Sequence, residues 1–174
     1  PRWRVEHAQI IDTADIKLFN RKIIPSVQPT HATSDMYWAE DRLGKSRLEG
    51  AYAYKALMKQ SGRIALGTDF PVEEVNPFLT FYAAVARQDQ EAFPEGGYLP
   101  QNKLTRMETL RGMTLWGAYA NFEEDQKGSI EVGKVADFVI LDRDIILISE
   151  KKIPKTRIVA TFLNGNIVYG NRIN

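Results

Sequence analysis

The chain has 174 residues, and its 23 Lys and Arg nearly balance its 22 Asp and Glu, giving a formal net charge of +1 at pH 7. This balance argues against nucleic acid or an anionic membrane as the main partner. The absence of cysteine excludes disulfides, thiolate nucleophiles and Cys-ligated metals. With His7 and His31 as the only histidines, a site built from many histidines cannot lie within this chain.

No apolar run approaches the roughly 18 residues that a membrane-spanning helix needs. The chain starts at Pro1, not Met, and enters Trp3-Arg4-Val5-Glu6-His7 at once, with no leader-like segment before it. We therefore expect a fragment or a processed product. The lack of cysteine fits oxidising and reducing compartments equally, so the compartment stays open, with the cytoplasm favoured.

The N-terminal part of the sequence predicts alternating strands and helices. Residues 3–6 read as a short strand, and a cap at Asp12 or Thr13 predicts a helix to about Arg21. A second apolar run covers residues 23–27 and is ended by Pro29. The polar segment 30–46 is expected to be irregular.

The middle of the chain repeats this alternation. Periodic apolar residues predict a helix over 48–59, stopped at Ser61-Gly62. A short strand over 63–68 follows, then a helix over 77–87. Residues 88–103 are rich in Gly and Pro and are expected to form a loop.

The predicted secondary structure changes near residue 125, from alternating strands and helices to short β-type runs. Before it, Thr105 and Glu108 have the spacing of a capping box that opens a helix to about Asn121. After it, Asn164-Gly165 favours a tight hairpin, because both central positions of such a turn need positive φ. Short β-type runs cover residues 129–131, 138–141, 158–163 and 167–169.

The length of the first part matches half of an α/β barrel. An eight-stranded (β/α)₈ barrel takes about 250 residues, or about 31 per unit, so residues 1–125 correspond to about four units. The predicted fold class is therefore α/β, with residues 1–125 as half of a TIM barrel. Residues 126–174 are predicted to be a small β appendage.

Three polar side chains follow predicted parallel strands at their C-terminal ends. His7 follows residues 3–6, His31 follows residues 23–27 and Asp69 follows the strand that ends at Thr68. Active sites of α/β barrels form at this end, where the βα loops converge. Two imidazoles and a carboxylate suit Zn²⁺ or a similar divalent ion. A structural role, such as a helix cap at Asp69, is the alternative.

Four motifs in order resemble the amidohydrolase superfamily, and most closely its amidohydrolase-3 branch, which includes N-substituted formamide deformylase and D-aminoacylase-like enzymes. They are Arg-Trp-Arg-Val-Glu-His-Ala-Gln at 2–9, Ser-Val-Gln-Pro-Thr-His at 26–31, Leu-Gly-Thr-Asp-Phe-Pro-Val at 66–72 and Gly-Ser-Ile-Glu-Val-Gly-Lys-Val-Ala-Asp-Phe-Val-Ile-Leu at 128–141. The resemblance covers nearly the whole chain. It implies barrel strands five to eight, followed by the C-terminal part of a β-sandwich domain.

The resemblance also implies residue roles. His7 and His31 match the metal-ligating histidines after strands five and six, and Asp69 matches the strand-eight aspartate that binds metal and moves protons. Arg47 resembles an arginine that contacts substrate in this branch, with a solvated surface arginine as the alternative. Gln28 is a candidate to orient the substrate, with a hydrogen bond to the backbone at the strand end as the alternative. Strand seven is expected somewhere around residues 42–48.

The family's N-terminal His-x-His pair, the strand-four ligand and the first half of the sandwich have no counterpart in this sequence. We expect the longer parent protein to be a metal-dependent hydrolase of carbon–nitrogen bonds other than peptide bonds, with a small amide-like substrate and one or two divalent metals, zinc favoured. The isolated chain is expected to be inactive and to self-associate, or to pair with the missing half, through exposed barrel edges. An inert scaffold is the alternative reading.

Overall fold

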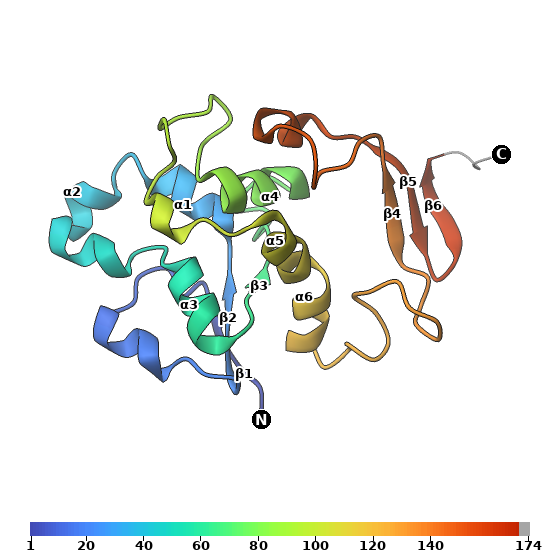
Figure 1. The fold of residues 1–174 in the computed structure, drawn as a ribbon, viewed down its shortest axis with the longest axis horizontal. Helices are drawn as coiled ribbons and strands as arrows, with labels where there is room; N and C mark the ends of the chain where they lie inside the picture. The colour runs from blue at the N-terminus through green and yellow to red at the C-terminus, as the bar shows by residue number, and fades with distance from the viewer. Residues whose placement is uncertain (171–174) are drawn as a thin grey trace.

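A computed structural model describes residues 1–170 and places two separate three-stranded sheets in the chain (Figure 1). The first is parallel, with the order β1 (Trp3–Glu6), β2 (Ile23–Val27), β3 (Ala65–Leu66). The second is antiparallel and combines β4 (Phe138–Leu141), β5 (Ile158–Leu163) and β6 (Asn166–Gly170). Along the chain, helices α1 to α3 come between β2 and β3, and α4 to α6 between β3 and β4. The fold is therefore a mixed α/β arrangement.

The central strand β2 tolerates a proline because of its register. Pro25 pairs with Val5 of β1, whereas pairing with β3 begins only at Ser26. Pro25 therefore has a strand partner on one side only, which is the situation in which a strand accepts a residue without an N–H. Ile24 and Val27 of the same strand are buried in the core.

The prediction that residues 30–46 are irregular is wrong. Pro29 does not only end a strand; it also begins a helix. Helix α1 (Pro29–Asp35) has this proline in its first turn, where the missing N–H costs no hydrogen bond. Helix α2 (Ala39–Leu43) follows. The sequence signal is weak because α1 is short and rich in Thr and Ser, which are poor helix formers. Burial of its first five residues compensates.

The strand expected around residues 42–48 is absent from the described part of the chain. A 3₁₀ helix, η2 (Lys45–Gly50), occupies this region after α2. Strand β2 pairs directly with β3, and Ala51 makes only an isolated bridge with Ile10. The helix predicted over 48–59 accordingly begins later, as α3 (Tyr54–Ser61), and ends at Gly62 in the left-handed conformation as predicted.

Helix α4 (Pro77–Ala86) agrees with its prediction and is buried along most of its length. Thr105 and Glu108 form the predicted capping box, but the expected helix to residue 121 is two helices, α5 (Arg106–Met113) and α6 (Leu115–Ala120). The helix is interrupted at Thr114, whose φ of −128° and ψ of −92° are not helical. Sequence periodicity continues through this break and could not reveal it.

The remaining 3₁₀ helices are η1 (Thr13–Leu18), η3 (Pro100–Asn102) and η4 (Glu150–Lys155). The first replaces the longer helix predicted to Arg21, and Asp12 caps it through Ala14 N. Residues 129–131 are not a strand, and Ile130 is 88% exposed. The chain from residue 171 to 174, within the predicted second unit 126–174, lies outside the described residues.

The hairpin between β5 and β6 has the predicted geometry. Asn164 and Gly165 have φ of +49° and +75°, and the flanking strands pair antiparallel. In the core, one apolar cluster packs helix α3 against β2, and a second packs α4 against residues around Ile153. No helix within residues 1–170 is long and apolar enough to cross a membrane.

Candidate metal centre

Parallel strands β1, β2 and β3 direct their C-terminal ends toward one cluster of polar side chains. His7 immediately follows β1, Gln28 immediately follows β2, and Asp69 follows β3 after two residues. Backbone hydrogen bonds hold the strand ends together, from His7 N to Ser26 O at 2.7 Å and from Gly67 N to Val27 O at 3.1 Å. The three residues predicted to meet at these strand ends, His7, His31 and Asp69, do lie close together.

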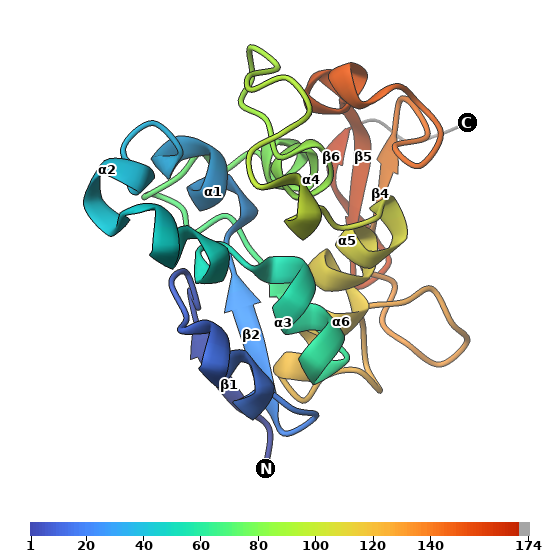
Figure 2. The same ribbon diagram turned by 60° about the vertical axis from the view of Figure 1, so that its left-hand side comes forward.

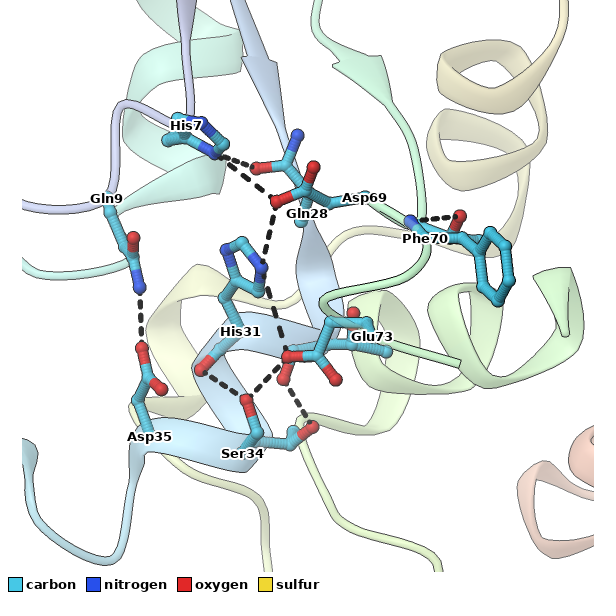
Figure 3. Close-up of polar contacts among 12 residues, drawn as sticks. His7, Gln9, Gln28, His31, Ser34, Asp35, Asp69, Phe70 and Glu73 are labelled. Carbon is cyan, nitrogen blue, oxygen red and sulfur yellow. Dashed lines mark hydrogen bonds and ion pairs between the residues drawn. The ribbon is translucent and has the colours of Figure 1, made fainter. Parts of the chain in front are cut away.

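His31 lies in helix α1 and is the buried member of the cluster, with its side chain 9% exposed (Figure 3). Its Nε2 is 3.6 Å from Asp69 Oδ2 and 3.9 Å from Glu73 Oε1. Neither ring nitrogen has a hydrogen-bond partner among the described residues. Because a buried imidazole normally satisfies its nitrogens, this arrangement points to a ligand.

His7 completes the cluster from the exposed side. Its Nδ1 is 2.9 Å from Gln28 Oε1 and 3.9 Å from Asp69 Oδ2, and its ring stacks with that of His31 at a centroid distance of 5.9 Å. If Nδ1–H donates to Gln28, Nε2 keeps a lone pair available for a metal, which is how a supporting hydrogen bond fixes the tautomer of a metal-ligating histidine.

The donor set fits a divalent cation. One ligand atom each of His7, His31 and Asp69 can be chosen so that all three lie within 4.8 Å of one another. Ligands about 2.0–2.1 Å from a tetrahedral metal are about 3.3 Å apart, so a small contraction would bring the three groups onto one ion. Neutral imidazole nitrogens and one carboxylate are ligands that zinc and related metals accept.

Backbone strain marks two of the three ligand candidates. His7 has φ of +64° and Asp69 has φ of +62°, a left-handed region that few non-glycine residues occupy. Asn, Asp and His enter it most readily because their short polar side chains bond locally. The strained backbone at both positions is held by neighbouring hydrogen bonds, including Val72 N to Asp69 O at 2.8 Å, and such strain clusters at functional sites.

Of the two residues predicted to bind substrate, Gln28 lies in this cluster and Arg47 does not bond to it. Gln28 is 7% exposed, and its side-chain oxygen faces His7. Arg47 is exposed and donates from Nε to Leu43 O at 2.6 Å, at the C-terminal end of α2. There the guanidinium satisfies a helix carbonyl and complements the helix dipole.

Glu73 is a further site residue that the sequence did not reveal. It lies four residues after Asp69 and accepts a hydrogen bond of 2.7 Å from Ser34 Oγ while facing His31 (Figure 3). The two carboxylates have the i,i+4 spacing of helix neighbours, but they lie in a turn and not in a helix, so only the fold brings both to His31.

A second hydrogen-bonded group lies at the C-terminal end of α1. Asp35 Oδ2 accepts hydrogen bonds from Gln9 Nε2 at 2.5 Å and from Tyr52 Oη at 2.8 Å. Burial, together with the hydrogen bond to Asp35, raises the pKa of Tyr52 well above its usual value, so this phenol stays protonated. Gln9 and Tyr52 thereby anchor the C-terminal residue of the helix that carries His31.

Two histidines and an aspartate gathered at the C-terminal edge of a parallel sheet form a donor set that could hold a metal ion. The chain belongs to the amidohydrolase family described by the Amidohydro_3 model, which matches residues 1–169. It is 34% identical over 167 residues to amidohydrolase YtcJ of Bacillus subtilis, covering 95% of this chain and 32% of that protein. Over 118 residues it is 27% identical to N-substituted formamide deformylase of Arthrobacter pascens, covering 68% of this chain and 21% of that enzyme.

A solved structure shows the same fold. An uncharacterized metal-dependent hydrolase from Pyrococcus horikoshii OT3 superposes with a TM-score of 0.73 at 31% identity, covering 84% of this chain and 30% of that one. The chain thus spans about a third or less of the length of these relatives.

Proposed function

We propose that this chain supplies part of the active site of a longer metal-dependent hydrolase that cleaves amide-type carbon–nitrogen bonds. The observation that carries the proposal is the buried His31 imidazole, whose two nitrogens have no hydrogen-bond partner within residues 1–170 and whose Nε2 lies 3.6 Å from Asp69 Oδ2. The family membership and the likeness to a deformylase support the carbon–nitrogen specificity.

In this proposal His7, His31 and Asp69 hold the metal, with zinc the favoured ion. A bound divalent metal supplies water activation near neutral pH and polarisation of the substrate carbonyl. Asp69 takes one proton as the water oxygen forms a bond to the carbonyl carbon, and then gives that proton to the leaving nitrogen when the carbon–nitrogen bond breaks. Its side chain is 34% exposed, which leaves it accessible to water and substrate.

Gln28 and Arg47 have different proposed roles. Gln28 holds the His7 ring through its hydrogen bond, and acts as a positioning residue with a further contact to substrate. Arg47 is proposed to meet a substrate carbonyl or carboxylate. Its exposed position and its bond to Leu43 O equally support the structural alternative of a helix-end contact.

We further propose that residues 1–125 are about half of a (β/α)₈ barrel and that residues from 126 onward are part of a β-sandwich. Parallel strands β1 to β3 and antiparallel strands β4 to β6 support this division. The isolated chain is proposed to be inactive and to pair with another copy or with the rest of the barrel. Edge strand β1, with Trp3 67% exposed, supports pairing.

The test is to measure metal content and amide hydrolysis of the full-length protein that contains this chain. A panel of N-formyl and N-acetyl amines is incubated with the zinc-loaded and the chelator-treated protein. Metal-dependent release of the amine supports the proposal, and absence of hydrolysis across the panel in metal-loaded protein overturns it. Protein carrying His31→Leu controls for contaminating hydrolases.

A further inference from the structure

A fully buried arginine without a carboxylate partner lies directly after α4. Arg87 is 0% exposed, and no carboxylate among residues 1–170 forms an ion pair with it. Its Nε donates to Tyr98 O at 2.9 Å, and its Nη1 donates to Tyr52 O at 3.3 Å. Because burying a charge without a counter-ion is unfavourable, the two carbonyl groups that it holds are the contacts that indicate its role.

One of these carbonyl groups belongs to the short segment that leads into α3. Besides its hydrogen bond to Tyr52 O, the Arg87 guanidinium lies over the ring of Tyr54, with Cζ 5.3 Å from the ring centroid. Both tyrosines are buried, and their rings meet edge to face. Arg87 therefore contacts the backbone and one ring of a buried aromatic segment.

The two phenols of this segment reach the two ends of the helix that carries His31. Tyr54 Oη donates to Gln28 O at 3.1 Å, and Gln28 is the residue that precedes α1. Tyr52 Oη donates to Asp35 Oδ2 at 2.8 Å, and Asp35 is the last residue of α1. In Figure 2 the segment that leads into α3 passes the C-terminal end of β2, where α1 begins. One segment thus holds the helix at both ends.

We propose that Tyr52 and Tyr54, held by Arg87, are positioning residues for the metal centre. This inference rests on the proposed function and adds to it the residues that keep the metal ligands in place. By fixing α1, the two phenols set the position of the His31 ring, whose nitrogens have no hydrogen-bond partner within residues 1–170. Groups that orient metal ligands through hydrogen bonds strengthen metal binding, although they do not touch the metal.

The second histidine of the centre depends on the same segment. Tyr54 fixes the backbone carbonyl of Gln28, and the side-chain oxygen of Gln28 lies 2.9 Å from His7 Nδ1. Both imidazole rings are therefore linked to the Tyr52–Tyr54 segment, one through a helix and the other through a glutamine side chain.

Backbone strain at two of the positioning residues is a separate observation in favour of this role. Tyr52 has φ of +48° and Arg87 has φ of +57°, a conformation that is an outlier for bulky residues. Neighbouring backbone bonds maintain it, from Tyr52 N to Gln9 O at 2.7 Å and from Tyr98 N to Arg87 O at 2.6 Å. Such strain clusters at functional sites, and here it lies at both ends of the hydrogen bond between Arg87 and Tyr52.

The charge states of these groups suit their proposed role. Burial raises the pKa of the Tyr54 phenol well above its usual value, so it stays a hydrogen-bond donor. Burial lowers the pKa of Arg87 to about 10, so its guanidinium is still charged at neutral pH. The donors that the segment needs are therefore present under the conditions in which the metal centre is proposed to work.

The test measures zinc affinity by calorimetric titration, and the visible spectrum of the cobalt-substituted form, in the full-length protein. Tyr52→Phe and Tyr54→Phe each remove one hydroxyl, and each should raise the Kd for zinc about tenfold and change the cobalt bands. Tyr82→Phe is the matched control, because Tyr82 is buried and its Oη donates to Gln88 Oε1 at 3.0 Å instead of to α1. It should leave both readouts unchanged.

Arg87→Lys tests the arginine itself. Lysine keeps the positive charge but lacks the planar fork that reaches two carbonyl groups, so the Kd for zinc should again rise about tenfold. If this variant does not fold, the two tyrosine variants decide the proposal. All titrations are made at a temperature where unfolding curves show each protein to be folded, so that a change in Kd does not reflect lost stability.

Failure of the positioning role and failure of the proposed function give different results. Unchanged zinc affinity in both Tyr52→Phe and Tyr54→Phe, or an equal loss in Tyr82→Phe, overturns the positioning role and leaves the hydrolase proposal standing. If the wild-type protein binds no zinc, the hydrolase proposal fails, and amide hydrogen exchange of residues 29–35 decides whether the phenols fix α1. Faster exchange in the two tyrosine variants but not in Tyr82→Phe supports this, and equal exchange in all variants overturns it.

Discussion

His31 Nε2 and Asp69 Oδ2 face each other across 3.6 Å, although one belongs to a buried helix and the other to a strained, half-exposed loop. The distance is too long for a hydrogen bond and close to the separation of two ligands on one metal. This geometry predicts that His31 and Asp69 bind the same metal ion. Replacing His31 by Leu should abolish zinc binding, measured by calorimetric titration of the full-length protein.

The same substitution separates a metal ligand from a structural histidine. Because neither nitrogen of His31 is hydrogen-bonded to any residue that the structure describes, His31→Leu should leave the metal-free protein equally stable or more stable by about 1 kcal/mol in urea unfolding. His7→Asn is the control, since His7 is half exposed, and it should weaken zinc binding without that gain. Loss of stability in metal-free His31→Leu would contradict the ligand assignment.

Replacing Asp69 by Asn should remove the proton-transferring group while keeping the backbone. Asn tolerates the left-handed φ of +62°, so the melting temperature should change little, whereas kcat should fall about 10²–10⁴-fold. Asp69→Ala should lose activity similarly and be less stable by about 1 kcal/mol, because Ala at positive φ is strained. Metal content of both variants distinguishes lost catalysis from lost binding.

The contact between Lys55 and Glu108 should make stability depend on pH. Burial alone would raise the pKa of Glu108, but hydrogen bonds from Lys55 and Thr105 outweigh it and hold that pKa below its usual value. Since the folded-state pKa is depressed, the contribution is present above the unfolded value of 4.5 and is lost as pH falls through the folded value. Glu108→Gln preserves the capping box and removes only the ionic contact with Lys55, so it should cost up to about 1 kcal/mol at pH 7.

This cost should shrink toward zero as pH falls below 4.5, measured by urea unfolding of wild type and variant across that range. Glu49→Gln serves as the charge-matched control, because Glu49 is exposed. A difference between wild type and Glu108→Gln that does not change with pH would refute the ionic contribution.

The tight turn between β5 and β6 should respond strongly to loss of its glycine. Gly165 has φ of +75°, so Gly165→Ala should destabilise the chain by about 1 kcal/mol. Gly67→Ala is the comparison, because a Cβ at Gly67 would meet open space and its φ is not positive. Equal unfolding midpoints for the two variants would argue against the turn geometry.

Exposed strand edges should lead the isolated chain to associate. Light scattering of the purified 174-residue chain is expected to show dimers or larger species, and Trp3→Lys should shift it toward monomer by placing a charge on edge strand β1. A monodisperse monomer at all concentrations would count against pairing through this edge.

The site was more predictable from sequence than the connections around it. His7 and Asp69 could be placed because each follows a strand, and parallel strands bring their C-terminal ends to one edge. Helix α1 was missed because its stability comes from burial of a Thr-rich segment, not from helix propensity. Glu73 was missed because it reaches His31 through a loop whose path no periodicity encodes.

The capping box at Thr105 and the Asn164-Gly165 turn were confirmed because both leave a local sequence signal, the Thr-x-x-Glu spacing and a residue pair that accepts positive φ. The break at Thr114 and the 3₁₀ helix over Lys45–Gly50, where a strand was expected, depend on packing with distant segments. Local turn and capping signals, and the meeting of parallel strand ends, could therefore be predicted from this sequence, whereas the packing that interrupts its helices could not.

The left-handed backbone at His7 and Asp69 also restricts how this centre could change through mutation. Only Gly, Asn, Asp and His enter that conformation at small cost, and three of these four carry metal-ligating or hydrogen-bonding groups. Exchange of His and Asp at either position would therefore change the charge and hardness of the ligand set while keeping the chain path. The fold thus leaves metal preference open to single substitutions at positions where most other residues would weaken the protein.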